Sequence, residues 1–241
     1  MTVERGLVIA GRVIPGTEWC LRDDTAWIGI GERGTRQRAA TVDVLVGHWT
    51  AGEGGVHSYD DDGPRVYRAM RSRKRADGSP MDVGVHFVIG ACPDDAEHAQ
   101  VWQLADPGLV ACVHVGDRGI NRRSIGVEVV SAGLPGPLDV RHRPRVTVPL
   151  LGRVRTVLAF YPGQLRSWVR LAETLAALDG QGGIAIPRQV PSHGASARLS
   201  RVAARRWAGA LEHLHVSDRK IDAAGLLVGA LADAGWARVQ P

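Results

Sequence analysis

The sequence predicts an α/β protein with a mixed central β-sheet, helices on both faces of that sheet and a small N-terminal β extension. Short apolar runs of strand length alternate along the chain with segments of helical periodicity, which is the pattern of layered α/β domains. The apolar run that ends in Gly47-His48-Trp49 suits a buried central strand. A length of 241 residues fits one elaborated domain. We place the extension at residues 1–40 and the main domain at 41–241.

The N-terminal half is expected to be rich in short strands. Residues 1–40 contain apolar, β-branched segments separated by turns. The GxGxxG pattern at 29–34 is interpreted as a turn, because the strand at residue 42 follows too soon for the helix that a dinucleotide site needs. We expect a helix at 64–75 with a proline in its first turn. Further strands are expected at residues 83–90, 101–105 and 124–130.

The C-terminal half begins with an irregular segment and ends in helices. Residues 132–160 are rich in Pro, Gly and Arg, and we interpret them as an insertion or long loop. A leucine stripe completed by Trp168 predicts an amphipathic helix at 165–178. A short strand near 184–191 and a final helix follow, with Asp222 at the position of the helix N-cap.

The composition excludes several classes of protein. Hydrophobic residues make up 44% and charged residues 23%, as in globular proteins. No apolar run approaches the ~18–20 residues that span a bilayer. The first residues contain an early Glu4 and an interrupting Arg12, unlike a secretory signal peptide, so we expect synthesis in the cytoplasm. Three cysteines without CxxC spacing indicate neither a disulfide scaffold nor a cysteine-only zinc site.

The net charge of +5 favours anionic partners such as bacterial cell wall. A basic cluster at residues 65–75 fits the solvated face of a helix at least as well as a binding groove. Aromatic residues are only 5% of the chain and do not alternate with the basic ones, so we expect no nucleic-acid partner. We also expect no membrane span and a monomeric protein.

Histidines are the most informative residues for chemistry. Two of the nine, His213 and His215, precede Asp222 by a short loop, and His48 ends the predicted central strand. Two imidazoles and one carboxylate would leave the fourth tetrahedral position of a zinc ion open, which is the catalytic arrangement. A single histidine is more often a hydrogen-bonded residue of the core, or a surface residue, than a metal ligand.

Five ordered blocks resemble the zinc-dependent N-acetylmuramoyl-L-alanine amidases of type 2, the superfamily of phage lysozyme-type amidases and peptidoglycan recognition proteins. The resemblance spans residues 43–227 and leaves the first 40 residues and 132–160 outside the familiar core. The blocks read VLVGHWTAG, VGVHFVIG, VWQLADPGLVACVHVGD, INRRSIGVEVV and HLHVSDRKIDAAG.

The resemblance implies a role for each matching residue. His48, His213 and Asp222 correspond to the zinc ligands. Lys220 corresponds to a lysine beside the metal, and Glu128 to the glutamate that many members use as general base.

A second group matches positions at the substrate. His114 corresponds to a histidine lining the substrate groove, and Asn121 lies in the loop before the strand of Glu128. Trp49 offers a stacking surface for sugar or peptide, although packing in the core explains it equally well. The structural alternatives are a buried ion pair for Glu128, a surface position for Lys220 and simple packing for His114.

The sequence also departs from the family pattern. The usual glycine before the second ligand is Glu212, and Val85 stands where some relatives carry a tyrosine, which puts more weight on Glu128. His215 competes with His213 for the second ligand position, and the family spacing favours His213.

The resemblance implies zinc-dependent hydrolysis of the amide between N-acetylmuramic acid and L-alanine in peptidoglycan or muropeptides. Two other functions stay open: a protein that binds peptidoglycan without cutting it, and a zinc hydrolase of another amide bond. Acting on wall material without an export signal fits release by lysis, dedicated delivery or recycling of muropeptides.

Overall fold

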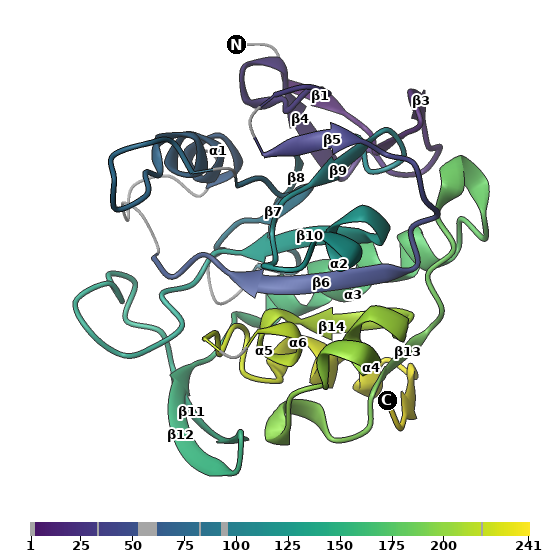
Figure 1. Cartoon of the computed structure of the whole chain (residues 1–241). Helices are drawn as coiled ribbons and strands as arrows, with labels where there is room; N and C mark the ends of the chain where they lie inside the picture. Colours follow the sequence, from purple (N-terminus) through teal and green to yellow (C-terminus); the bar gives the residue numbers. More distant parts are fainter. Residues whose placement is uncertain (1–2, 33, 53–61, 82, 93–95, 218) are drawn as a thin grey trace.

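The computed structural model describes residues 3–32, 34–52, 62–81, 83–92, 96–217 and 219–241. A mixed sheet with the order β1-β4-β8-β7-β10-β6-β14 forms the centre of this part of the chain (Figure 1). In that order the strands are Val3–Arg5, Cys20–Asp23, Val101–Gln103, Phe87–Ile89, Ser124–Val129, Val44–Trp49 and Gly209–Glu212. The predicted mixed α/β sheet is confirmed.

Strands β6 and β10 carry two of the candidate site residues, His48 and Glu128. Every residue of both strands is buried, as their continuous apolar sequence predicts. They pair in parallel with Ser124 opposite Val44 and Glu128 opposite His48. Strand β14 runs parallel to β6 on its other side. The carboxyl ends of these three strands therefore meet at one edge of the sheet.

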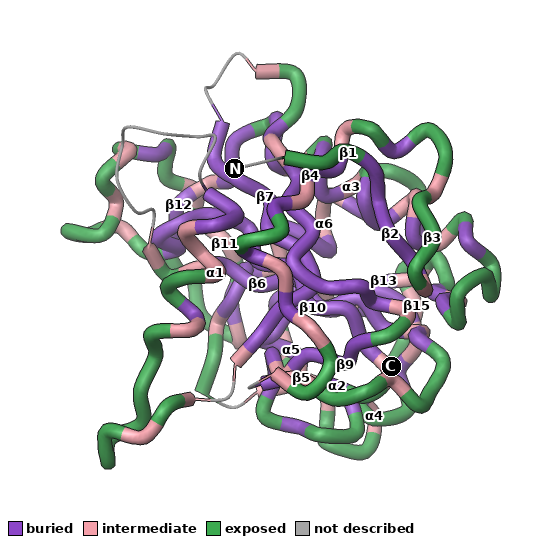
Figure 2. Tube along the Cα trace, turned by 90° about the horizontal axis from the view of Figure 1, so that it is seen from above, coloured by how far each residue is buried: buried purple, intermediate pink, exposed green. Residues whose placement is uncertain are grey.

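Helices cover both faces of the sheet. On one face, a Cβ atom added to Gly47 would lie 2.5 Å from Leu227 of α6 (Leu226–Asp233) and 3.4 Å from Trp168 of α3 (Pro162–Ala176). On the other face, Val44 and Val46 cluster with residues of α2 (Arg118–Arg123) and α4 (Arg201–Arg206). Helix α1 (Asp62–Ser72) contacts β7 and β8. Figure 2 shows the buried strands enclosed by more exposed segments.

The N-terminal residues are β-rich, as predicted, but they join the central sheet. Strand β4 pairs in parallel with β8, and β1 extends the sheet beyond it. The remaining elements of this region are β2 (Val8–Ile9), β3 (Arg12–Val13), η1 (Asp24–Ala26) and β5 (Thr35–Gln37), which pairs with β9 (Val110–Cys112). The backbone amide of Val8 donates to Gln103 Oε1 of β8. These residues thus complete one edge of the sheet.

The segment at 132–160 is not simply a loop. It contains an antiparallel hairpin, β11 (Arg145–Leu150) and β12 (Arg153–Leu158), which extends away from the sheet (Figure 1). Leu151 and Gly152 join the strands with φ of 51° and 75°, the backbone of a two-residue hairpin turn. The hairpin was hidden in the sequence by Pro149 and three arginines, since both residue types are typical of loops.

The C-terminal part also differs from prediction at two points. Helix α4 was not predicted, and the final helix α6 is capped by Gly225 rather than by Asp222. The other elements are η2 (Gln181–Gly183), β13 (Gln189–Pro191), η3 (Gly194–Ser196), α5 (His213–Val216) and β15 (Ala237–Val239). None of the helices in the described ranges has the length and apolar character needed to cross a bilayer.

Candidate metal centre and active site

The structure brings together three side chains from distant parts of the chain. His48 lies near the carboxyl end of β6, His213 begins α5 directly after β14, and Asp222 lies between α5 and α6. The Nδ1 atoms of His48 and His213 are 3.0 Å apart. Asp222 Oδ2 lies 3.2 Å from His213 Nδ1 and 3.8 Å from His48 Nδ1. All three residues are buried.

This arrangement fits a tetrahedral zinc ion. With zinc–nitrogen bonds of about 2.0–2.1 Å, two ligands at the tetrahedral angle are about 3.3 Å apart. The three separations of 3.0, 3.2 and 3.8 Å lie around that value. Two imidazole nitrogens and one carboxylate oxygen are also the donor types that zinc prefers. Three ligands leave one coordination position for water or substrate.

The electrostatics of the cluster favour a cation at its centre. Burial lowers the pKa of His48 to about 4, so its imidazole is neutral at physiological pH. Burial alone would raise the pKa of Asp222, but the neighbouring imidazoles of His213 and His48 hold that pKa well below its usual range. The cluster therefore presents a neutral His48 imidazole and an ionised carboxylate, the forms that bind metal.

Glu212 fixes the segment that carries Asp222. Its buried carboxylate accepts hydrogen bonds from the backbone amides of Gly225, Leu227 and Val228 at 2.5, 2.8 and 3.0 Å. These amides begin α6, where the unpaired N–H groups attract negative charge. Glu212 thus joins the end of β14, next to His213, to the start of α6. Glu212, which stands where the family usually has glycine, therefore has a structural role in this protein.

His114 lies behind the cluster and is buried. Its Nδ1 lies 3.0 Å from His48 Nε2, and its Nε2 lies 2.8 Å from Ser124 Oγ. The ring packs on Gly126, where an added Cβ would come within 2.6 Å of His114 Cγ. His114 can therefore hold the His48 ring with Nδ1 turned toward Asp222, as groups behind metal ligands do. The importance of Ser124 and Gly126 was not visible in the sequence, because it depends on packing between β10 and the residues after β9.

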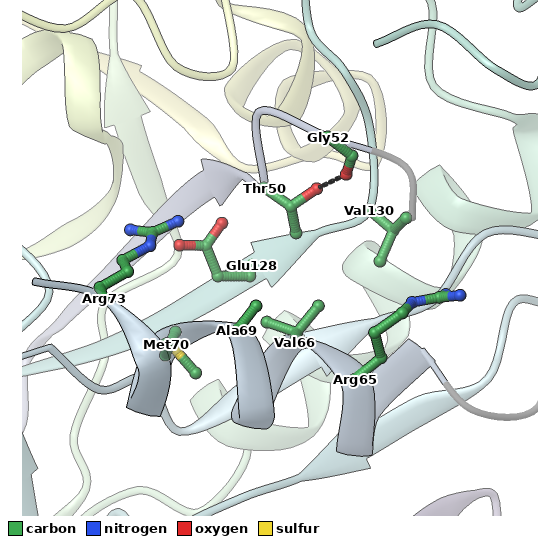
Figure 3. A pocket seen from close by; sticks show the side chains of 9 residues that line it. All are labelled: Thr50, Gly52, Arg65, Val66, Ala69, Met70, Arg73, Glu128 and Val130. Carbon is green, nitrogen blue, oxygen red and sulfur yellow. Dashed lines mark hydrogen bonds between the residues drawn. The ribbon is translucent and has the colours of Figure 1, made fainter. Parts of the chain in front are cut away.

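The side chain of Glu128 lines a pocket between α1 and the end of β10. The pocket has a volume of about 170 Å³, and Figure 3 shows its lining. Burial, and then the nearby charge of Asp222, raise the pKa of Glu128 to about 8. Its Oε2 atom is buried without a hydrogen-bond partner in the described residues. A carboxyl group in such surroundings can exchange protons near neutral pH.

Lys220 is exposed, two residues before Asp222. Its positive charge lowers the pKa of both His48 and Glu128, so it lies within electrostatic reach of the cluster. Arg73, on the segment that follows α1, also lowers the pKa of Glu128 and lines the same pocket. Only the general basic cluster at 65–75 pointed to Arg73 in the sequence.

The other two predicted substrate residues are held inside the protein. Asn121 Oδ1 accepts hydrogen bonds from the backbone amides of His114 and Val115, and its amide group donates to the Val115 carbonyl. Trp49 is only 6% exposed and packs against Gly133. Asn121 therefore braces the backbone around His114, and the environment of Trp49 matches the core-packing alternative.

The competing histidine, His215, is directed elsewhere. Its Nε2 lies 2.8 Å from the carbonyl oxygen of Gly194, and its Nδ1 accepts a hydrogen bond from the amide of Glu212. The group able to hold a metal in the described residues comprises His48, His213 and Asp222. His86 is also buried, between Arg38 and the backbone of β10.

Comparison with known proteins gives a family match. The model of the family described as N-acetylmuramoyl-L-alanine amidase matches residues 38–222. A comparison with curated proteins found no match. Comparison with solved structures also found matches, and three of them are described below.

The endolysin of the Thermus scotoductus bacteriophage Ph2119 is 19% identical, with a TM-score of 0.45, over 90% of this chain and 99% of the endolysin. AmpDh3 from Pseudomonas aeruginosa is 16% identical, with a TM-score of 0.47, over 88% and 65% of the two chains. Escherichia coli AmiD, in complex with anhydro-N-acetylmuramic acid-L-Ala-D-γ-Glu-L-Lys, is 21% identical with a TM-score of 0.35. That match covers 58% of this chain and 45% of AmiD.

Proposed function

Because the chain belongs to the N-acetylmuramoyl-L-alanine amidase family, we propose that it hydrolyses the amide between the lactyl group of N-acetylmuramic acid and the first L-alanine of the peptide stem. The substrate is peptidoglycan or a muropeptide derived from it. A stem such as the one bound to AmiD, with L-Ala followed by γ-linked D-Glu, is a suitable test substrate.

The observation that carries this proposal is the convergence of His48, His213 and Asp222 around one point. When bound there, zinc would lower the pKa of a water molecule to about 7 and polarise the substrate carbonyl. The three side chains would hold the ion, with His48 and His213 binding through Nδ1. His114 keeps the His48 ring in the required orientation.

Glu128 would act as the general base and then as the general acid. It lies opposite His48 in the parallel pairing of β6 and β10, which places its carboxyl beside the cluster. It would accept a proton from the attacking water and deliver it to the amine that leaves. Lys220 would stabilise the negative charge that develops on the attacked carbonyl oxygen.

A peptidoglycan-binding protein without hydrolytic activity would not need this complete set. Loss of a ligand or of the acid/base group would be expected in such a protein. Here the three predicted ligands, His48, His213 and Asp222, and also Glu128 are all present and buried at the same sheet edge. This observation favours the enzyme over the binding protein.

The proposal is tested with a defined muropeptide, N-acetylmuramoyl-L-Ala-D-isoglutamate, and with mass spectrometry of the products. We expect free N-acetylmuramic acid and the free dipeptide, loss of activity with a chelator, and recovery on addition of zinc. His48→Ala should lose metal and activity together, whereas His98→Ala, at an exposed histidine beside Glu97, should keep both. Cleavage of another bond, or activity that resists the chelator, would contradict the proposal.

A further inference from the structure

The pocket beside Glu128 has features of a binding site. Its walls are formed by residues of β10, by α1 and by Arg73, which directly follows α1. It is lined by Thr50, Gly52, Arg65, Val66, Ala69, Met70, Arg73, Glu128 and Val130. Glu128 is more than nine-tenths buried, and its Oε2 atom has no hydrogen-bond partner in the described ranges. An unpaired buried carboxyl oxygen is costly unless a ligand or water completes its hydrogen bonding.

The direction of proton transfer identifies which part of the substrate enters this pocket. This step rests on the proposed function, in which Glu128 delivers a proton to the leaving amine. The leaving amine belongs to the first residue of the peptide stem, and proton delivery requires it to lie within hydrogen-bond reach of the Glu128 carboxyl. The peptide stem, not the sugar, therefore continues into the pocket.

The floor of the pocket suits a small apolar side chain. Val66, Ala69 and Met70 of α1 face Val130 of the chain after β10 (Figure 3). These side chains can bury the methyl group of a first-position alanine. A buried methyl group contributes about 0.8 kcal/mol of hydrophobic free energy, roughly a fourfold effect on affinity.

The positive charge in the pocket suits a carboxylate farther along the stem. Arg65 is already paired with Asp62. The side chain of Arg73 is exposed, has no hydrogen bond to the described residues and extends beside Glu128 in Figure 3. Among the described residues that line the pocket, Glu128 is the one carboxylate. Arg73 is therefore the cation available to a second carboxylate brought in by the substrate.

We propose that the pocket between α1 and β10 binds the peptide stem, and that Arg73 determines specificity by binding the free α-carboxylate of a γ-linked second residue. The apolar floor selects alanine at the first position. In this arrangement Arg73 distinguishes stems that carry the carboxylate from stems in which it is amidated.

Two substrates that differ only at that group test the role of Arg73. They are N-acetylmuramoyl-L-Ala-D-γ-Glu-L-Lys, in which the α-carboxylate of the γ-linked second residue is free, and the same compound with that carboxylate converted to an amide. We expect the wild-type protein to cleave the carboxylate form about tenfold more efficiently, as for a charge-assisted hydrogen bond at a partly exposed site. Arg73→Met should reduce kcat/KM for the carboxylate form to the level of the amidated form, mainly through KM.

Lys74→Met is the matched control, because it removes the same charge at the next residue, which does not line the pocket. It should keep the wild-type preference. Equal cleavage of both substrates by the wild type, or a preserved preference in Arg73→Met, would overturn the inference while leaving the amidase activity intact. If the wild type cleaves neither substrate, the proposed function itself fails and the inference fails with it.

The floor of the pocket is tested separately with Ala69→Leu, a substitution at an exposed helical position that should leave folding unaffected. It should lower kcat/KM for a stem that begins with alanine several-fold more than for a stem that begins with glycine. An equal loss for both stems would contradict the assignment of the floor to the alanine methyl group.

Discussion

His114 connects the candidate metal centre to the strand beneath it, although it was expected to line the substrate groove. Its nitrogens contact His48 on one side and Ser124 on the other. His114→Phe keeps the ring but removes the acceptor for His48, so we expect zinc affinity to fall about 10- to 100-fold. Competition with a chromogenic chelator would measure the change.

The variant His114→Gln provides the comparison for that experiment. Its side-chain oxygen can still accept a hydrogen bond, so part of the lost zinc affinity should return. Equal zinc affinity in the wild type and His114→Phe would show that the orientation of His48 does not depend on His114.

Glu128 gives the clearest separation between metal binding and chemistry. Glu128→Gln keeps the size of the side chain but removes its ability to accept a proton. We expect the zinc content to stay near one equivalent per chain while turnover falls roughly 10²–10⁴-fold. Turnover close to that of the wild type would exclude Glu128 as the base.

At the scale of elements, strand β10 is shaped to receive the ring of His114. Gly126 leaves space that any side chain would fill, since an added Cβ would lie 2.6 Å from the ring. Gly126→Ala should therefore displace His114, destabilise the fold by about 1–3 kcal/mol and weaken zinc binding. Urea unfolding and zinc titration would measure the two effects.

A glycine in a helix provides the control for this prediction. Gly229 lies inside α6, and an added Cβ there would meet nothing within 4 Å. Gly229→Ala should stabilise the protein by about 0.5–1 kcal/mol, because alanine favours the helix, and should not affect zinc. Equal effects of the two substitutions would contradict the packing argument.

Elements with strong local patterns could be predicted from the sequence, and elements made by distant pairing could not. The apolar run of β6 and the leucine stripe of α3 identify these elements by themselves. Strand β9 has three residues and exists because β5, far away in the sequence, pairs with it. In the hairpin of β11 and β12, alternating Val and Thr were masked by arginines and Pro149.

The same distinction applies to the candidate site. Family spacing predicted His48, His213 and Asp222, and the structure places them together, while their roles as ligands stay a prediction. The buried positions of His114 and Asn121 depend on packing that no local pattern reveals. Glu212 differs from the family residue, and its function as an acceptor for the start of α6 required the structure.

At the scale of the whole molecule, the protein buries several histidines in neutral form. Burial lowers the pKa of His48 and His215 to about 4 and that of His86 to about 3, and it lowers the pKa of His114 well below the usual value. An unfolded histidine has a pKa near 6.5. As the pH falls below 6.5, the unfolded chain therefore gains protons that the folded protein does not accept, and the folded protein loses stability.

Two buried carboxyls act in the opposite direction. Burial raises the pKa of Glu128 to about 8 and that of Glu212 to about 7. The folded protein binds these protons at a higher pH than the unfolded chain does, so these groups stabilise the fold as the pH falls toward 4.5. The stability of the protein in acid is therefore a balance between the buried histidines and the two buried carboxyls. The contribution of one histidine can be measured by substituting that histidine alone.

His86 is suitable for this purpose, because its ring contacts Arg38 and the backbone of β10 and does not belong to the metal-binding group. Each buried neutral histidine contributes about 1.4 kcal/mol of unfolding free energy per pH unit between its unfolded and folded pKa values. We predict that His86→Gln, measured by urea unfolding of metal-free protein, is less stable than the wild type at pH 7. Between pH 6 and 4.5 its unfolding free energy should decrease less steeply than that of the wild type, by about 1.4 kcal/mol per pH unit. Parallel pH dependences for the two proteins would mean that His86 is protonated in the folded state, which its buried position beside the Arg38 guanidinium opposes.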